Sequence, residues 1–123
     1  MAKFEYTFAG DFTHFLAYLS RSVLEGSVSA SAEGSSDFAT ADTRVAVRVF
    51  ERYSMLGNNR VSLNVTVVGV RDVVHVVAIT SGGSQAALWK VNTFGEESFL
   101  EKAKAAILPY APPQDRLPGE NRR

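Results

Sequence analysis

The sequence predicts an α+β fold in which a curved antiparallel sheet of five to six strands carries two helices on one face. Valines alternate with other residues over residues 45–49, and a similar alternation recurs over residues 61–67, which is typical of strands. Apolar residues recur at helical spacing over residues 12–23 and again over residues 99–108. Both helices have an apolar stripe to bury, and the valine face of the sheet is the apolar surface available to them.

A strand followed by a helix opens the chain. Phe4, Tyr6 and Phe8 alternate with polar residues, which predicts a strand with an aromatic inner face. Asp11 follows, and its carboxylate is suited to accept hydrogen bonds from the first turn of a helix. Gly26 is a favourable residue for the end of that helix. The first helix is therefore expected between Asp11 and Gly26.

The middle of the chain reads as a series of strands. Small residues alternating with serines predict a short strand at residues 27–32, followed by a polar loop over residues 33–42. Four further strands are expected at residues 43–53, 60–68, 73–80 and 85–91. Their short connections favour an antiparallel meander, because parallel neighbours need a crossover helix. The predicted order is β-α-β-β-β-β-β-α, which is similar to a reduced helix-grip arrangement with a ligand cavity between sheet and C-terminal helix.

A second helix and a tail are expected to complete the chain. Thr93 and Glu96 have the spacing of a capping box, and Pro109 is expected to stop the helix that follows. Residues 1–110 are thus predicted to form one domain. Residues 111–123 contain three prolines, alternating charges and little to bury, so they are expected to be a disordered tail.

Composition argues against several classes of function. The chain has 13 Lys and Arg against 13 Asp and Glu, so its formal net charge is zero, and neither nucleic acid nor a membrane is expected as a partner. It has no cysteine and two histidines, so no metal site and no cofactor is predicted. No signal peptide and no segment of about 20 apolar residues is found, which favours a cytoplasmic location.

A glycine-rich segment is the first candidate ligand site. It consists of Ser81, Gly82, Gly83, Ser84 and Gln85. Paired glycines flanked by hydroxyls can present consecutive amide donors to an anion. The alternative is an ordinary hairpin turn, because Gly-Gly is common there and the lysine of a nucleotide-binding loop is missing.

A row of arginines is the second candidate. Arg44, Arg48 and Arg52 share one parity of their strand and are expected to project away from the buried face of the sheet. Polar residues on the neighbouring strand are expected to join them on that outer face: Ser62, Asn64 and Thr66. Together they would form a platform for a carboxylate or a phosphate. The alternative is a solvated face whose arginines pair with acids such as Glu5.

Phe50 does not fit that outer face. It has the same parity as the arginines, although a large aromatic residue is unexpected on a wet surface. Either a bulge near Glu51 shifts the register, or the surface is covered, for example by another subunit. Both alternatives stay open at this point.

The two histidines are expected to be structural. His14 lies in the first turn of a predicted helix and His75 on a predicted strand, and neither has a nucleophile or orienting carboxylate near it in sequence. No catalytic residue is therefore predicted.

Three stretches together resemble a family of small uncharacterised bacterial proteins, a domain of unknown function found largely in Gram-positive bacteria. The stretches are residues 44–54 (RVAVRVFERYS), residues 57–64 (GNNRVSLN) and residues 78–86 (AITSGGSQA) running into residues 92–97 (NTFGEE). The resemblance covers about residues 1–110. It implies a bacterial cytosolic protein and carries no assigned activity.

Three hypotheses for function follow. The leading one is a non-enzymatic module that binds a small molecule or a partner, with the ligand between sheet and C-terminal helix near Trp89, and with Arg48 or the glycine-rich segment holding its polar end. The second is a structural subunit that forms homo-oligomers through its sheet, as Phe50 suggests. The third is an enzyme whose site is assembled from distant strands and includes His75, Glu51 or Arg48.

Overall fold

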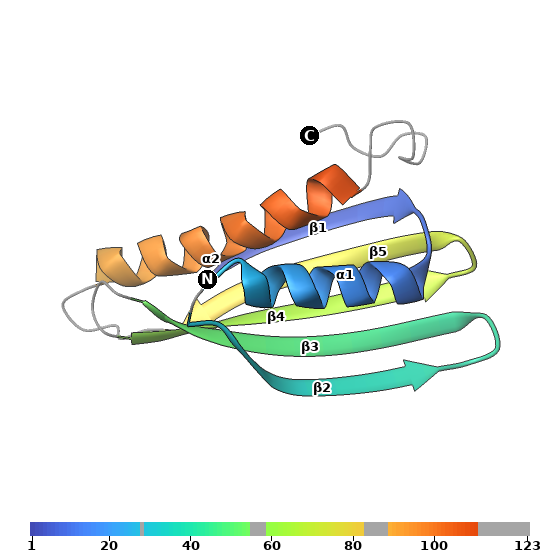
Figure 1. Cartoon of the computed structure of the whole chain (residues 1–123), viewed down its shortest axis with the longest axis horizontal. Helices are drawn as coiled ribbons and strands as arrows, with labels where there is room; N and C mark the ends of the chain where they lie inside the picture. Colours follow the sequence, from blue (N-terminus) through green and yellow to red (C-terminus); the bar gives the residue numbers. More distant parts are fainter. Residues whose placement is uncertain (28, 55–58, 83–88, 111–123) are drawn as a thin grey trace.

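The fold is a five-stranded antiparallel sheet with two helices against one face, as predicted (Figure 1). The structure is a computed structural model and describes residues 1–27, 29–54, 59–82 and 89–110, apart from the side chains of residues 54, 59 and 89–98. The strands are β1 (Ala2–Ala9), β2 (Ser31–Ala39), β3 (Thr43–Ser54), β4 (Asn59–Val70) and β5 (Val73–Gly82). They lie in the order β1-β5-β4-β3-β2.

The first helix, α1 (Phe12–Glu25), begins and ends where the sequence predicts. The Asp11 carboxylate accepts a hydrogen bond of 2.7 Å from the amide of His14, and the amide of Gly26 donates to the carbonyl of Ser22 at the other end. One face of α1 is buried through residues spaced three or four apart: Phe12, Phe15, Leu19 and Val23.

The second helix, α2 (Trp89–Tyr110), is longer than predicted at both ends. It begins before Thr93, and Pro109 lies within its last turn. The strand predicted at residues 85–91 is wrong for residues 89–91, which are helical, while residues 83–88 and the predicted tail at 111–123 lie outside the described residues. Within the described ranges, neither helix is both long and apolar enough to cross a membrane.

The two faces of the sheet differ. The helix face is the one that α1 and α2 cover, and most of the core lies there, including Phe50, Leu63, Val65, Val76 and Ala78. The open face is the opposite one. On β4 the prediction holds, since Leu63 and Val65 are buried on the helix face while Asn64 is exposed on the open face.

On β3 the predicted orientation is wrong. Ala46 and Phe50 are buried in the core, with Phe50 only 2% exposed, so the arginines of the same parity lie on the helix face. Val47 and Val49 lie on the open face, where Val49 pairs with Asn64. Pairing of β3 with β4 is unbroken along β3, so no bulge near Glu51 is needed to explain Phe50. Phe50 is covered by the core on the helix face of the sheet.

The polar segment predicted as a loop over residues 33–42 is largely strand β2. A bulge interrupts its pairing with β3 between Ala32 and Gly34. None of its side chains is buried, and Phe38 is 65% exposed. Hydrophobic alternation could not reveal this strand, because its backbone bonds to β3 hold it in place rather than its side chains.

Within the described core, Thr80 is a fully buried polar residue, and its hydroxyl has no hydrogen-bond partner. Burying an unpaired hydroxyl is unfavourable. We expect Thr80→Val to raise the free energy of unfolding by about 1 kcal/mol, because the shape is kept and the unpaired group is removed. Urea denaturation measures this, with Thr43→Val, whose hydroxyl contacts Asp42 at the surface, as a control expected to change it by less than about 0.5 kcal/mol. A loss of stability in Thr80→Val would contradict the expectation.

Candidate functional site

The arginine row, defined as Arg44, Arg48 and Arg52, lies on the helix face of β3. The three residues alternate along the strand with the buried Ala46 and Phe50. Residues four apart on a strand are separated by about 13 Å. Arg44 contacts the start of α1 and Arg52 contacts Ser27 just after its end, so the row follows the helix along its length. The row therefore lies between α1 on one side and the edge strand β2 on the other.

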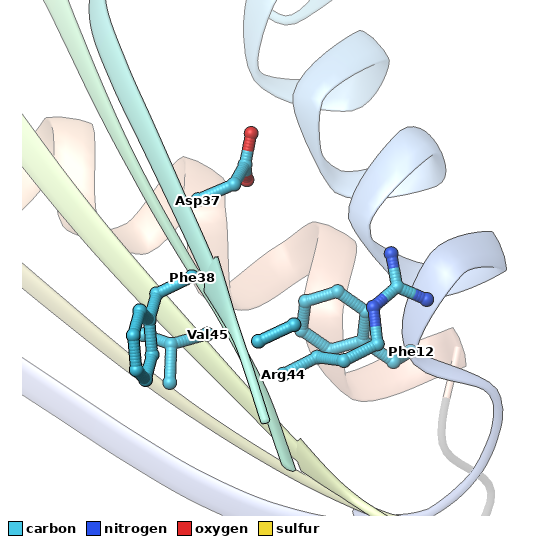
Figure 2. Close-up of a pocket in the computed structure, with 6 residues that line it drawn as sticks. Phe12, Asp37, Phe38, Arg44 and Val45 are labelled. Atoms are coloured by element: carbon cyan, nitrogen blue, oxygen red, sulfur yellow. The ribbon is translucent and has the colours of Figure 1, made fainter. Parts of the chain in front are cut away.

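Arg44 marks the end of the row at the beginning of α1. Its Nη1 donates a hydrogen bond of 2.6 Å to Oγ1 of Thr13, and its guanidinium carbon lies 4.5 Å from the centre of the Phe12 ring. An open recess of about 210 Å³ adjoins it, lined by Phe12, Asp37, Phe38, Ala39, Arg44 and Val45. Figure 2 shows Phe12 and Arg44 on one side of β2 and β3, with Phe38 and Val45 on the other. The recess thus wraps around the edge of the sheet.

Arg48 occupies the middle of the row. Its Nη1 lies 3.0 Å from Oδ1 of Asp37 on β2 and also donates to the carbonyl oxygen of Val47 at 3.0 Å. The side chain of Arg48 is 21% exposed, whereas that of Asp37 is 66% exposed. A half-buried cation is thus paired with a carboxylate that reaches it from solvent.

Arg52 closes the row at the other end. Its Nη1 donates a hydrogen bond of 2.9 Å to Oγ of Ser27, and its guanidinium carbon lies 4.7 Å from the centre of the Phe99 ring. Burial lowers the pKa of the Arg52 guanidinium below its ordinary value. Arg52 nevertheless stays charged at neutral pH, because an arginine loses its proton only at very high pH.

The chemistry of the row is that of cationic hydrogen-bond donors. Guanidinium groups offer paired N–H donors that match the oxygens of a carboxylate or phosphate. Two extended arginine side chains that start about 13 Å apart on one strand can both reach an anion that lies between them. Arg44 and Arg48 can therefore converge on one anion beside the recess. Among the described residues, no carboxylate lies within ion-pair distance of Arg44.

Among the described residues that were predicted to form a ligand site, Arg48 lies apart from Asn64 and Ser81. Arg48 lies on the helix face, whereas Asn64 and Ser81 lie on the open face, and Gly82 ends β5 with a φ of 120°. The expected platform of arginines with Ser62, Asn64 and Thr66 is wrong for the same reason, since the two groups occupy opposite faces. Gly83, Ser84, Gln85 and the side chain of Trp89 lie outside the described residues.

The predicted cavity between sheet and second helix is filled where the structure describes it. Phe99, Ala103 and Ile107 of α2 are buried and belong to the same core cluster as Val76 and Ala78 of β5. Core side chains therefore occupy that part of the interface between sheet and helix. The portion near Trp89 lies outside the described side chains.

Asp37 was missed as a site residue by the sequence analysis. It lies in a segment without hydrophobic alternation that was assigned to a loop, so nothing placed it beside Arg48. The signal that could have placed the arginine row correctly was Phe50. A large aromatic residue marks the buried parity of a strand more reliably than valines do, because valine is also favoured on exposed strand surfaces.

Both histidines acquire partners from distant parts of the chain. Nδ1 of His75 lies 2.6 Å from Oγ1 of Thr7, and its Nε2 lies 3.4 Å from Oε1 of Glu5, across the β1–β5 pairing. Lys3, which bonds and attracts the Glu5 carboxylate, holds the pKa of Glu5 below its ordinary value. The hydroxyl–imidazole–carboxylate chain ties β1 to β5 on the open face.

His14 pairs with the end of α2. Its Nδ1 lies 2.5 Å from the hydroxyl oxygen of Tyr110, whose ring also packs against Phe8, Phe15 and Tyr18. Partial burial of the hydroxyl raises the pKa of Tyr110 above its ordinary value. These contacts join the two helices. Within the described residues, no three metal-ligating side chains gather at one place.

The geometry defines an open-faced two-layer α+β domain with a cationic row beside one helix. The chain belongs to the family of unknown function DUF6054, whose model matches residues 1–111. Neither the curated proteins nor the solved structures give a match to this chain.

Proposed function

We propose that this protein is a non-enzymatic module that binds a small anion, a carboxylate or a phosphate, at Arg44 and Arg48. The resemblance noted in the sequence supports a bacterial, cytosolic setting for it. The zero formal net charge of the chain supports a small ligand over nucleic acid or a membrane surface, which would need a broad cationic field.

The observation that carries the proposal is the pairing of Arg48 with Asp37. Asp37 occupies the position that a ligand carboxylate would take, 3.0 Å from the guanidinium, and it comes from an edge strand that buries none of its side chains. Asp37 is itself 66% exposed, and ion pairs near the surface contribute about 0–1 kcal/mol, so a ligand with two anionic oxygens can displace this carboxylate at little cost. The recess beside Arg44 then receives the rest of the ligand.

Titration with inorganic phosphate and with succinate tests the site. We expect the side-chain NMR signals of Arg44 and Arg48 to shift on addition of one or both anions. Arg48→Gln should weaken binding by about tenfold or more, because a charge-assisted hydrogen bond to the ligand is lost. Asp37→Asn should strengthen binding, because it removes the competing carboxylate.

Arg71→Gln is the matched control, since Arg71 lies in the turn between β4 and β5 and the substitution makes the same change in net charge. It is expected to leave binding unchanged. Equal weakening by Arg71→Gln and Arg48→Gln would show a general effect of charge, and no shift of the Arg44 and Arg48 signals with either anion would refute the proposal.

A further inference from the structure

The open face carries apolar side chains that nothing in the described structure covers. On β3 it presents Val45, Val47 and Val49, and on β5 it presents Val73, Val77 and Ile79. All six of these side chains are half-buried. An antiparallel sheet with one wet face usually alternates to polar residues on that side. This face instead keeps two apolar columns, as expected of a surface that is covered in use.

We infer that the open face binds the open face of a second copy of this chain, forming a symmetric dimer with the helices outside. The two-fold axis lies along β4 and between the two sheets. Such a dimer is an aligned sheet-on-sheet sandwich with an interior about 10 Å thick. Figure 1 shows that both helices lie on the other side of the sheet, so they do not obstruct this approach.

The arrangement of the columns is what selects a second copy as the occupant. A two-fold axis along β4 brings β3 of one copy over β5 of the other. The cross-strand register then places Val47 over Val77 and Val49 over Ile79 of the other copy, because each pair shares a row through Thr66 or Asn64. On the axis β4 meets its own copy, through the polar Ser62, Asn64 and Thr66 and, further along the strand, through Val68 and Val70. The face is therefore complementary to itself.

The charges at the edges fit the same arrangement. This axis also brings β1 of one copy over β2 of the other. One cross-strand row of the sheet runs from Lys3 through Ile79, Asn64 and Val49 to Gly34. The axis places Lys3 of one copy over Gly34 of the other. Lys3 therefore comes close to Glu33 of the other copy, which directly precedes Gly34. Both side chains are substantially exposed, and each also has an ion-pair partner in its own chain: Glu5 lies 3.1 Å from Lys3, and Arg60 lies 4.0 Å from Glu33. Opposite charges thus meet at both edges of the dimer.

Several polar groups of the open face have partners within their own chain. His75 is already bonded to Thr7 and Glu5, and Thr66 donates to the side-chain oxygen of Asn64 at 3.4 Å. Burying polar groups is costly when they are left without hydrogen bonds. Covering these groups leaves them paired within their own chain.

The area is sufficient for a dimer. Five strands spaced about 4.8 Å apart and about 30 Å long give a flat face of roughly 700 Å². A stable interface of standard size buries about 800 Å² on each partner, and side-chain relief adds to the flat area. One open face therefore matches what a specific dimer needs.

Sedimentation velocity over a range of protein concentrations tests the dimer. The unmodified full chain is expected to be a dimer, and Val47→Lys is expected to weaken dimerisation by about a hundredfold, because it buries an unpaired charge in the interface. Leu108→Lys is the matched control, since Leu108 is an exposed apolar residue on α2, and it is expected to leave the dimer intact. Circular dichroism confirms that both variants are folded.

A charge exchange tests the axis. Lys3→Glu and Glu33→Lys are each expected to weaken the dimer, and the double variant is expected to restore it, because the opposite charges meet again across the two-fold axis. A chain that stays monomeric at its highest soluble concentration would overturn the inference and leave the face to a different partner. A dimer that Val47→Lys does not weaken, or single charge variants that the double variant does not rescue, would overturn it equally.

Discussion

Replacing Phe50 with alanine is expected to lower the free energy of unfolding by about 3–5 kcal/mol. The ring is 2% exposed on the helix face of β3 and belongs to the core cluster, with Leu63 opposite it on β4. Truncation removes the buried ring and leaves a cavity that the neighbouring strand and helices cannot fill without moving. Equilibrium unfolding in urea measures the loss.

Val49→Ala is the matched control, because Val49 directly precedes Phe50 on the strand and lies on the opposite face. It is half-buried, so its truncation is expected to cost only about 1 kcal/mol. Both variants should be compared at concentrations where the unfolding midpoint no longer depends on the amount of protein, so that association does not contribute. If Val49→Ala proved the more damaging of the two, the orientation of β3 described above would be incorrect.

Replacing Gly69 with alanine is expected to cost about 2–3 kcal/mol. Gly69 is a buried residue of β4, and a Cβ atom added to it would lie 2.7–2.9 Å from Cδ1, Cβ and Cγ of Phe12. Atoms at that distance overlap, so Phe12 must move. Phe12 is the first residue of α1 and also lies against the Arg44 guanidinium, so the helix start is displaced with it. The measurement is again urea denaturation.

Gly34→Ala provides the comparison, because a Cβ atom there would meet its nearest neighbour, Cβ of Val49, at an ordinary 4.0 Å. It is expected to change stability by less than about 0.5 kcal/mol. In a double-mutant cycle, Phe12→Ala should remove most of the penalty of Gly69→Ala, because the two residues contact each other. A full penalty that persists in the Phe12→Ala background would show that the clash with Phe12 is not its cause.

The layer architecture could be predicted from the sequence because it depends on periodicity. The helical spacing of Phe12, Phe15, Leu19 and Val23, with Asp11 before them, is a local signal that packing did not need to correct. The antiparallel meander followed from connections too short for crossover helices. These features are encoded within windows of a few residues.

The face that each strand buries could not always be predicted, because alternation fixes two faces without saying which is inside. On β3 the valines and the arginines both read as a strand, and Ala46 is too small to decide between them. The long apolar stems of arginines can cover core residues while their charged ends stay near solvent, so arginine parity is compatible with the helix face. This single choice moved Arg48 away from Asn64 and changed the candidate site.

The edge strand β2 and its Asp37 could not be predicted for a different reason. Their positions depend on pairing with β3 rather than on burial of their own side chains. A strand of this kind leaves no hydrophobic pattern. The electrostatics of the arginine row therefore became visible only once the register was known.

The pairing of β1 with β5 has a consequence for how the chain folds during its synthesis. Ala2 lies opposite Thr80, so β1, which is synthesised before the other four strands of the sheet, pairs with β5, the last of them. The meander from β2 to β5 can assemble neighbour by neighbour, whereas joining β1 to it closes the longest loop in the sheet. Until β1 joins the sheet, the side chains of Phe4, Tyr6 and Phe8 are not packed in the core. The apolar side chains of β1 are accordingly exposed for longer than those of the other strands before the sheet is complete.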